Sequence, residues 1–184
     1  MKLLASSVVR LTNKGSTHGH LYLIDVDKDE STEVLKWDNT NINWEGRGNA
    51  RGLRGIAFYE DSIIVASGTH LLFLDKKFNI KKTFEHRLLG DIHEIFLYGN
   101  ELVVTSTLYD LILFLNIETM KMSRGYYIVP QKIKSGKSAL FHRKLIAIRV
   151  KLLYRFFNSK SKKEFIFKKI DPAVYEPVKT NSKK

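Results

Sequence analysis

Charged residues that could bind a ligand fall in two short stretches of the 184-residue chain. Arg51 and Arg54 belong to the first stretch, and Asp91, His93 and Glu94 belong to the second. An arginine guanidinium can donate two hydrogen bonds to one carboxylate, sulfate or phosphate group, so the two arginines indicate an anion site. Carboxylates and imidazoles are also ligands of divalent metal ions, which makes the second stretch a weak candidate for a metal site. Its spacing matches no recognised metal motif.

Each of these residues also has a purely structural interpretation. Arg54 could pair with Asp91 or Glu94, and His93 could form one hydrogen bond with a neighbouring blade. His93 and Glu94 are adjacent, and adjacent side chains of a strand point to opposite faces, so one of them faces the neighbouring sheet. His70 is the sixth predicted ligand-binding residue, although it too could be an ordinary loop histidine. No nucleophilic triad is identifiable, so we expect a binding protein more than an enzyme.

An internal repeat indicates which elements position these residues. Two long stretches match at an offset of 39 residues, and two shorter ones match at an offset of 41. A partial third copy lies at the start of the chain. The matching stretches are 54–67 with 93–106, 72–75 with 113–116, 3–6 with 64–67, and 21–25 with 72–75. Repeated units of this length are typical of folds that stack equivalent modules.

Each repeat predicts about four short strands rich in Val, Ile, Leu and Phe, joined by polar turns. The stretches 63–65, 71–74 and 102–104 are continuous apolar runs, which are typical of sheets covered on both faces. A unit of about 40 residues with four strands has the spacing of a β-propeller blade. We therefore predict an all-β fold, a partial β-propeller of two to three four-stranded blades over residues 1–122. An antiparallel sandwich is the alternative architecture.

Two motifs give this repeat a resemblance to known propellers. Arg54-Gly55-Ile56-Ala57-Phe58 and His93-Glu94-Ile95 fall on successive predicted inner strands. Over about residues 1–120 the chain resembles propellers of the NHL-repeat and gluconolactonase-like kind, and more closely an uncharacterised bacterial propeller group. The resemblance implies a site at the channel mouth, where gluconolactonase-like propellers hold a metal ion with carboxylate, amide or imidazole side chains.

Two features depart from a complete propeller of a familiar class. Propellers close with about four to eight blades, whereas the repeat accounts for about two and a half, so we expect a truncated member. Trp37-Asp38 is not the WD-repeat signature, because the Gly-His pair which that repeat requires is not placed before it correctly.

The strand directions of a blade predict that the site residues share one rim. In a four-stranded blade, the loop that enters the first strand and the loop between the second and third strands lie on the same side. Loops of this kind vary freely on a rigid scaffold and often carry binding residues. We therefore predict a site for a small anionic or sugar-like ligand at the channel rim. Its residues are Arg51, Arg54, His70, Asp91, His93 and Glu94.

Charge divides the chain near residue 122. The formal net charge is +12, and residues 121–184 hold 18 Lys and Arg against three acids. The basic segment 123–184 is predicted to be irregular and partly helical, with an amphipathic helix at 138–157 and a disordered end. Residues 148–152 alternate apolar and basic side chains, so a strand there is the alternative. Three interpretations of this segment stay open: a helix that packs on the blades, a contact with an anionic membrane surface, or a contact with nucleic acid.

Composition narrows the classes of function. The absence of cysteine excludes disulfides, thiolate metal sites and cysteine nucleophiles. No apolar run reaches the ~18 residues of a membrane-spanning helix, and the start lacks the pattern of a secretory signal, so we expect a cytoplasmic protein. We predict a non-catalytic binding or scaffold module without a cofactor. The alternative is a metal-dependent, lactonase-like hydrolase with Asp91, His93 and Glu94 at the metal. Open blade edges further predict self-association.

Overall fold

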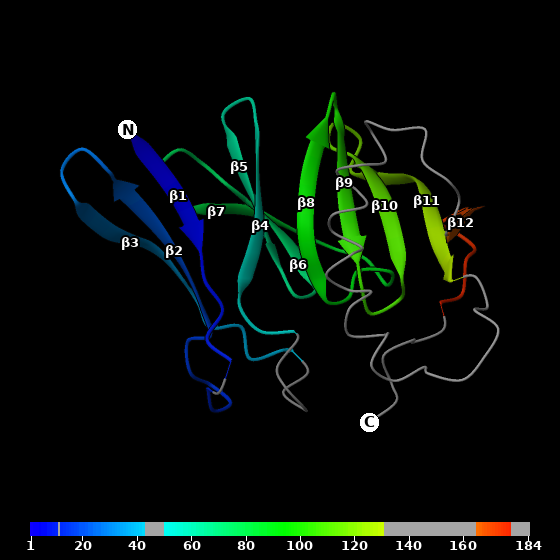
Figure 1. Ribbon diagram of the computed structural model, residues 1–184, viewed down its shortest axis with the longest axis horizontal. Coiled ribbons are helices and arrows are strands. Elements are labelled where there is room, and N and C mark those ends of the chain that lie inside the picture. Colours follow the sequence, from blue (N-terminus) through cyan, green and yellow to red (C-terminus); the bar gives the residue numbers. More distant parts are fainter. Residues whose placement is uncertain (11, 43–49, 131–164, 178–184) are drawn as a thin grey trace. The chain divides into compact units, whose positions relative to one another are not determined.

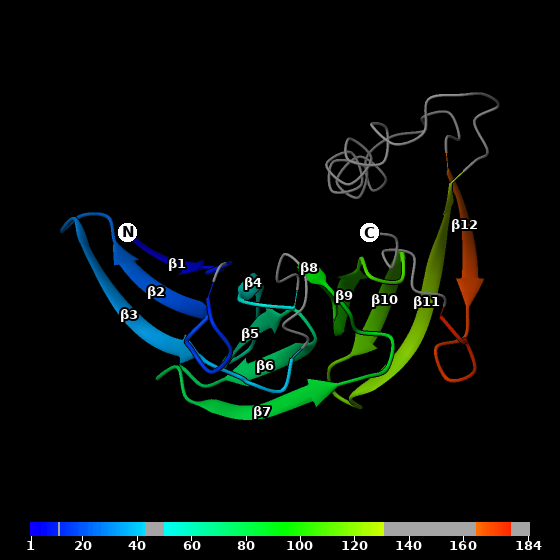
Figure 2. The ribbon, with the colours of Figure 1, turned by 90° about the horizontal axis from the view of Figure 1, so that it is seen from below.

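The computed structural model describes residues 1–10, 12–42, 50–130 and 165–177, and within these ranges the chain is all-β (Figure 1). Its strands form three antiparallel sheets that resemble partial propeller blades, which confirms the predicted fold class. Figure 2 shows each sheet as a separate meander. The first sheet contains β1 (Lys2–Ser6), β2 (Gly19–Asp25) and β3 (Glu30–Trp37), in that order.

The second and third sheets each begin with an inner strand that the first sheet lacks. The second sheet contains, in order, β4 (Leu53–Tyr59), β5 (Ser62–Ser67), β6 (His70–Leu74) and β7 (Ile80–Glu85). The third contains, in order, β8 (Ile92–Tyr98), β9 (Glu101–Ser106), β10 (Leu111–Asn116), β11 (Lys121–Pro130) and β12 (Phe165–Ile170). The predicted four strands per blade therefore hold for the second sheet, while the first has three strands and the third has five.

The strand registers follow the offsets of the sequence repeat. Val65 pairs with Leu72 across β5 and β6, and the residues at offsets 39 and 41, Val104 and Leu113, pair across β9 and β10. The turns correspond as well: Glu60 and Gly99 begin the β4–β5 and β8–β9 turns, with φ of 49° and 59°. The second and third sheets are thus equivalent units.

The residues of the first sheet are equivalent to those of the second sheet, but the match is shifted by one residue from the predicted match of 3–6 with 64–67. The Oγ of Ser7 accepts a hydrogen bond from the backbone N–H of His20, at 3.1 Å. The Oγ of Ser67 accepts the same bond from His70, at 3.0 Å. Ser7, rather than the predicted Ser6, is therefore the equivalent of Ser67.

Two apolar cores hold the sheets together, because the second sheet is covered on both faces. Ile63 and Val65 belong to the core shared with the first sheet, whereas Ile64 and Ala66 belong to the core shared with the third. Alternating side chains of one strand point to opposite faces, so the continuous apolar run of β5 supplies both cores. The prediction of sheets stacked on neighbouring sheets is confirmed here.

The C-terminal segment contributes a strand that the sequence analysis did not predict. β12 extends the third sheet by pairing beside β11. β11 itself crosses the predicted boundary at residue 122. Among the described residues, Met1–Tyr127 and 168–177 belong to one compact unit. The helix predicted at 138–157 falls outside the described residues. Within the described part of the chain, no helix has the length and hydropathy needed to span a membrane.

Candidate functional site

A close approach of the inner strands β4 and β8 creates the site. A Cβ atom added to Gly55 would lie 2.6 Å from the backbone nitrogen of Ile95, so only glycine lets the two strands come this near. The preceding residue, Arg54, is thereby brought beside His93. Its Nη1 donates a hydrogen bond to Nδ1 of His93 at 3.4 Å. The two residues that the repeat predicts to be equivalent are in direct contact.

The His93 ring is electrically neutral at pH 7. Burial lowers the pKa of His93 to about 4, and the positive charges of Arg54 and Arg10 act in the same direction. Because Nδ1 accepts the hydrogen bond from Arg54, the single proton of the neutral ring is on Nε2, which is a donor. The site thus combines a guanidinium, an imidazole N–H donor and the nearby charge of Arg10.

Arg54 is also close to carboxylates. Burial lowers the pKa of Arg54, while the charges of Asp91 and Glu94 oppose that shift. Partial loss of hydration raises the pKa of Glu94, and the Arg54 charge acts in the opposite direction. Asp91 is buried, and its backbone carbonyl accepts a hydrogen bond from the Thr107 hydroxyl at 2.7 Å. The structure therefore brings Arg54, Asp91, His93 and Glu94 together electrostatically.

Arg51 joins this group through a backbone contact. It is buried, and its guanidinium donates a hydrogen bond to the carbonyl oxygen of Arg10. Arg51 thereby helps to fix the segment whose Arg10 side chain acts on His93. Sequence reasoning missed Arg10, because it lies in a loop outside the repeat. No repeat signal could have found it.

His18 has a structural role in the same loops. The ring is fully buried, and its Nδ1 accepts a hydrogen bond from the Gly52 N–H at 2.8 Å. Its Nε2 bonds the carbonyl oxygen of Asn39 at 3.0 Å. Both ring nitrogens are occupied, so His18 ties the loop before β4 to the loop after β3.

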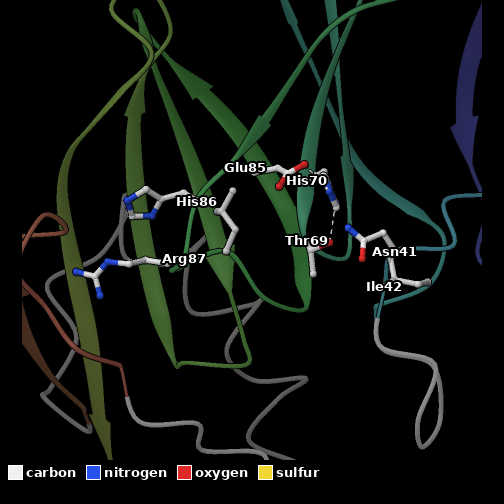
Figure 3. Close-up of a pocket in the computed structure, with 8 residues that line it drawn as sticks. Asn41, Ile42, Thr69, His70, Glu85, His86 and Arg87 are labelled. Carbon is white, nitrogen blue, oxygen red and sulfur yellow. Dashed lines mark hydrogen bonds and ion pairs between the residues drawn. The ribbon is translucent and has the colours of Figure 1, made fainter.

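The predicted site residue His70 lies in a different cluster. Its Nδ1 bonds the Thr69 hydroxyl at 2.6 Å and its Nε2 bonds Glu85 at 2.9 Å, as Figure 3 shows. These residues line an open cavity of about 610 Å³ whose wall also includes Asn41, Ile42, His86, Arg87 and Leu89. His20 of the first sheet likewise bonds a glutamate of its neighbouring outer strand, through its Nδ1 to Glu33 at 2.6 Å. This recurrence favours a structural role for His70.

The repeated serines are structural as well. Ser67 bonds the backbone of His70 within its own hairpin. Ser106 is fully buried, donates to the carbonyl oxygen of Leu88 at 2.6 Å and accepts from the N–H of Gly90 at 3.0 Å. It therefore holds the connection that leads into β8 and positions His93.

Replacing Ser106 with alanine should cost about 1–3 kcal/mol of folding free energy, because it leaves buried backbone groups unsatisfied. Urea unfolding followed by tryptophan fluorescence measures the effect. Ser123 of the same sheet is exposed and donates a hydrogen bond to the Glu101 carboxylate at 2.7 Å, so Ser123→Ala should change stability by less than about 0.5 kcal/mol. Equal unfolding midpoints for Ser106→Ala and the wild type would contradict the structural role of Ser106.

The metal candidates do not form a ligand set in the described structure. Among residues 1–10, 12–42, 50–130 and 165–177, no three His, Asp or Glu side chains are arranged to hold a metal ion. Asp91 is buried just before β8, whereas Glu94 is exposed on the strand. The site offers hydrogen-bond donors more than metal ligands.

Comparisons with known proteins find distant similarity in architecture. No protein-family model and no curated protein matches the sequence. The WD40 domain of Neurospora crassa Pan2 is similar at 12% identity and a TM-score of 0.43, over 62% of this chain and 32% of that one. Saccharomyces cerevisiae Sqt1 is similar at 9% identity and a TM-score of 0.46, over 69% and 35%. The chain therefore spans about a third of each. The finer resemblance to NHL-repeat and gluconolactonase-like propellers stays a prediction.

Proposed function

We propose that the chain is a non-catalytic binding module whose Arg54–His93 site binds a small anion, including the carboxylate of an acidic sugar. The observation that carries the proposal is the contact between the Arg54 guanidinium and the neutral imidazole of His93. The positive charges of Arg54 and Arg10 both act on this imidazole. A guanidinium fork and an imidazole N–H donor suit the planar oxygens of a carboxylate, or those of sulfate and phosphate.

The local charge supports an anionic ligand. If the nearby carboxylates dominated, they would raise the pKa of His93, whereas arginine charges lower it. Asp91 and Glu94 act on Arg54, and a negatively charged ligand would add to the negative charge facing Arg54 and Arg10. The loops on either side of the site are fixed by buried contacts of Arg51 and His18, so the donors are held in place before a ligand arrives.

The variant Arg54→Ala should bind sulfate, phosphate and glucuronate at least about tenfold more weakly than the wild type, because it removes a charged hydrogen-bond donor. Its melting temperature should be nearly unchanged. Isothermal titration calorimetry with each anion, and with uncharged glucose as the reference sugar, measures the binding. Arg54→Lys keeps the positive charge and loses the paired N–H donors of the guanidinium. Its affinity for the anions should therefore lie between those of the wild type and Arg54→Ala.

Arg87 provides a matched control. Its guanidinium bonds Glu176 at 3.0 Å and the carbonyl oxygen of Ala173 at 3.0 Å, away from β4 and β8. Arg87→Ala should therefore bind the anions as the wild type does. A large loss of stability in Arg54→Ala, with anion binding preserved, would assign Arg54 to the scaffold and overturn the proposal.

A further inference from the structure

The hydrogen bond between Arg54 and His93 joins the two groups that an anion would contact. Nη1 of Arg54 donates to Nδ1 of His93 at 3.4 Å, which makes it a long hydrogen bond. A guanidinium has no acceptor to offer, so Nδ1 is the acceptor and the ring proton is on Nε2. The lone pair of Nδ1 therefore faces the guanidinium, where it would repel the oxygen of a bound anion. As a neutral ring, His93 competes with a ligand for the N–H of Arg54.

In the described part of the chain, the charged groups that act on the His93 ring are arginines. Burial lowers the pKa of the ring to about 4, and the charges of Arg54 on β4 and of Arg10 in the loop after β1 act in the same direction. The carboxylates of Asp91 and Glu94, which flank His93 along the chain, act on Arg54. An anion bound at Arg54 would thus bring negative charge to a ring on which positive charge acts.

A bound anion would reverse this balance of charge. A negative charge within about 4–6 Å of a histidine raises its pKa by about 1–3, because it stabilises the protonated ring. When Nδ1 takes up a proton from the solvent, the ring becomes an imidazolium with an N–H donor on each nitrogen. The N–H groups of Nδ1 and of Nη1 of Arg54, whose nitrogens are 3.4 Å apart, can then both donate to one oxygen of the anion. Protonation thus turns His93 from a competitor of the anion into a second donor to it.

We propose that the site takes up a proton together with its anion, and that Nδ1 of His93 is the atom that binds the proton. This inference rests on the proposed function, because it describes how the same site binds its ligand. The affinity for the anion is constant above the pKa of the anion-bound ring. It increases as the pH falls from that value toward about 4, where the free ring is protonated as well. The site therefore holds anions most tightly in mildly acidic surroundings and releases them as the pH rises.

Calorimetric titration with sulfate at about pH 7.5 and about pH 5.0 tests the proposal. Sulfate stays a dianion across this range, so the ligand itself does not titrate. For an increase of about 2 in the pKa of His93, the wild type should bind sulfate about tenfold more tightly at the lower pH. Asparagine can accept the hydrogen bond from Arg54 and does not titrate, so His93→Asn should lose most of this increase. Circular dichroism at both pH values verifies that each protein is folded.

Nuclear magnetic resonance identifies the group that binds the proton. The chemical shift of the Cε1–H of the His93 ring, followed across pH with and without saturating sulfate, gives the pKa of the ring in each state, and sulfate should raise it. Glu94 is the rival proton acceptor, because burial raises the pKa of its carboxyl group while the Arg54 charge acts in the opposite direction. Glu94→Gln should keep the pH dependence of sulfate binding that the wild type shows.

The outcomes separate this inference from the proposed function on which it rests. Equal sulfate affinity at both pH values, with an unchanged pKa of His93, would overturn the uptake of a proton and leave the anion site intact. Loss of the pH dependence in Glu94→Gln would assign the proton to Glu94 and overturn the role of His93. A folded wild type that binds no sulfate at either pH would overturn the proposed function and this inference together.

Discussion

The Gly55→Val variant should lose about 3 kcal/mol or more of folding free energy and should separate Arg54 from His93. A Cβ at this position would lie 2.6 Å from the Ile95 nitrogen and 3.1 Å from the Cα of Glu94, and both are backbone atoms of a paired strand. The neighbouring strand cannot yield as a flexible side chain would. Overpacking of a rigid core costs about 1–3 kcal/mol, and here the two γ-methyl groups of valine add to the clash.

Two measurements check this result. Urea unfolding gives the loss of stability, and calorimetric titration with sulfate gives the loss of anion binding that follows when β4 moves away from β8. Gly99 is the matched control, because no atom lies within 4 Å of its Cβ position and asparagine tolerates its φ of 59°. Gly99→Asn should change stability by less than about 0.5 kcal/mol. If Gly55→Val unfolded at the wild-type urea concentration, the close approach of the inner strands would be wrong.

The pairing of strands could be predicted because it depends on local pattern. Apolar runs and polar turns repeat at a constant offset, so equivalent residues take equivalent places, as Val65 and Val104 do. The same offset aligned Arg54 with His93 at the start of adjacent inner strands, and their direct contact is a finding of the structure. These inferences need only sequence spacing and the geometry of strands.

The remaining features depend on contacts that have no periodic signal. The Arg10 charge reaches His93 from a loop, and its place is fixed by a backbone contact with Arg51. β12 pairs with β11 across a long stretch of intervening chain, which no local pattern reveals. His70 was assigned to the rim from strand direction alone. The structure shows its hydrogen bonds to Thr69 in the preceding turn and to Glu85 of β7.

The two serines at equivalent repeat positions have different hydrogen-bond partners. Ser67 and Ser106 occupy equivalent positions, yet Ser67 closes its own hairpin while Ser106 bonds Leu88 and Gly90 in the chain before β8. Equivalence in a repeat fixes the place of a side chain and leaves its partner free to change. Partners are therefore the part of a repeat protein that sequence spacing predicts least well.

Acidification should destabilise the protein by about 3 kcal/mol through His93 alone. The pKa of this residue is about 4 in the folded protein, against 6.5 for an ordinary histidine. Above pH 6.5 the ring is neutral in both states, and His93 has no effect on the free energy of unfolding. As the pH falls from 6.5 to 4, His93 binds a proton in the unfolded chain but stays largely neutral in the folded protein. The free energy of unfolding therefore decreases steadily over this range. Below pH 4 both states are protonated and the full cost has been reached.

The His93→Asn variant isolates this contribution. Asparagine presents a carbonyl oxygen near the position of Nδ1, where it can accept the hydrogen bond from Arg54, and it does not titrate. The pKa values of His18 and His86 are also lowered by burial, so both proteins should lose stability in acid. The free energy of unfolding of His93→Asn, relative to that of the wild type, should nevertheless increase by about 3 kcal/mol between pH 7 and pH 4. Urea unfolding at half-unit intervals of pH measures it, and parallel curves for the two proteins would show that His93 titrates normally and that the arginines do not act on it.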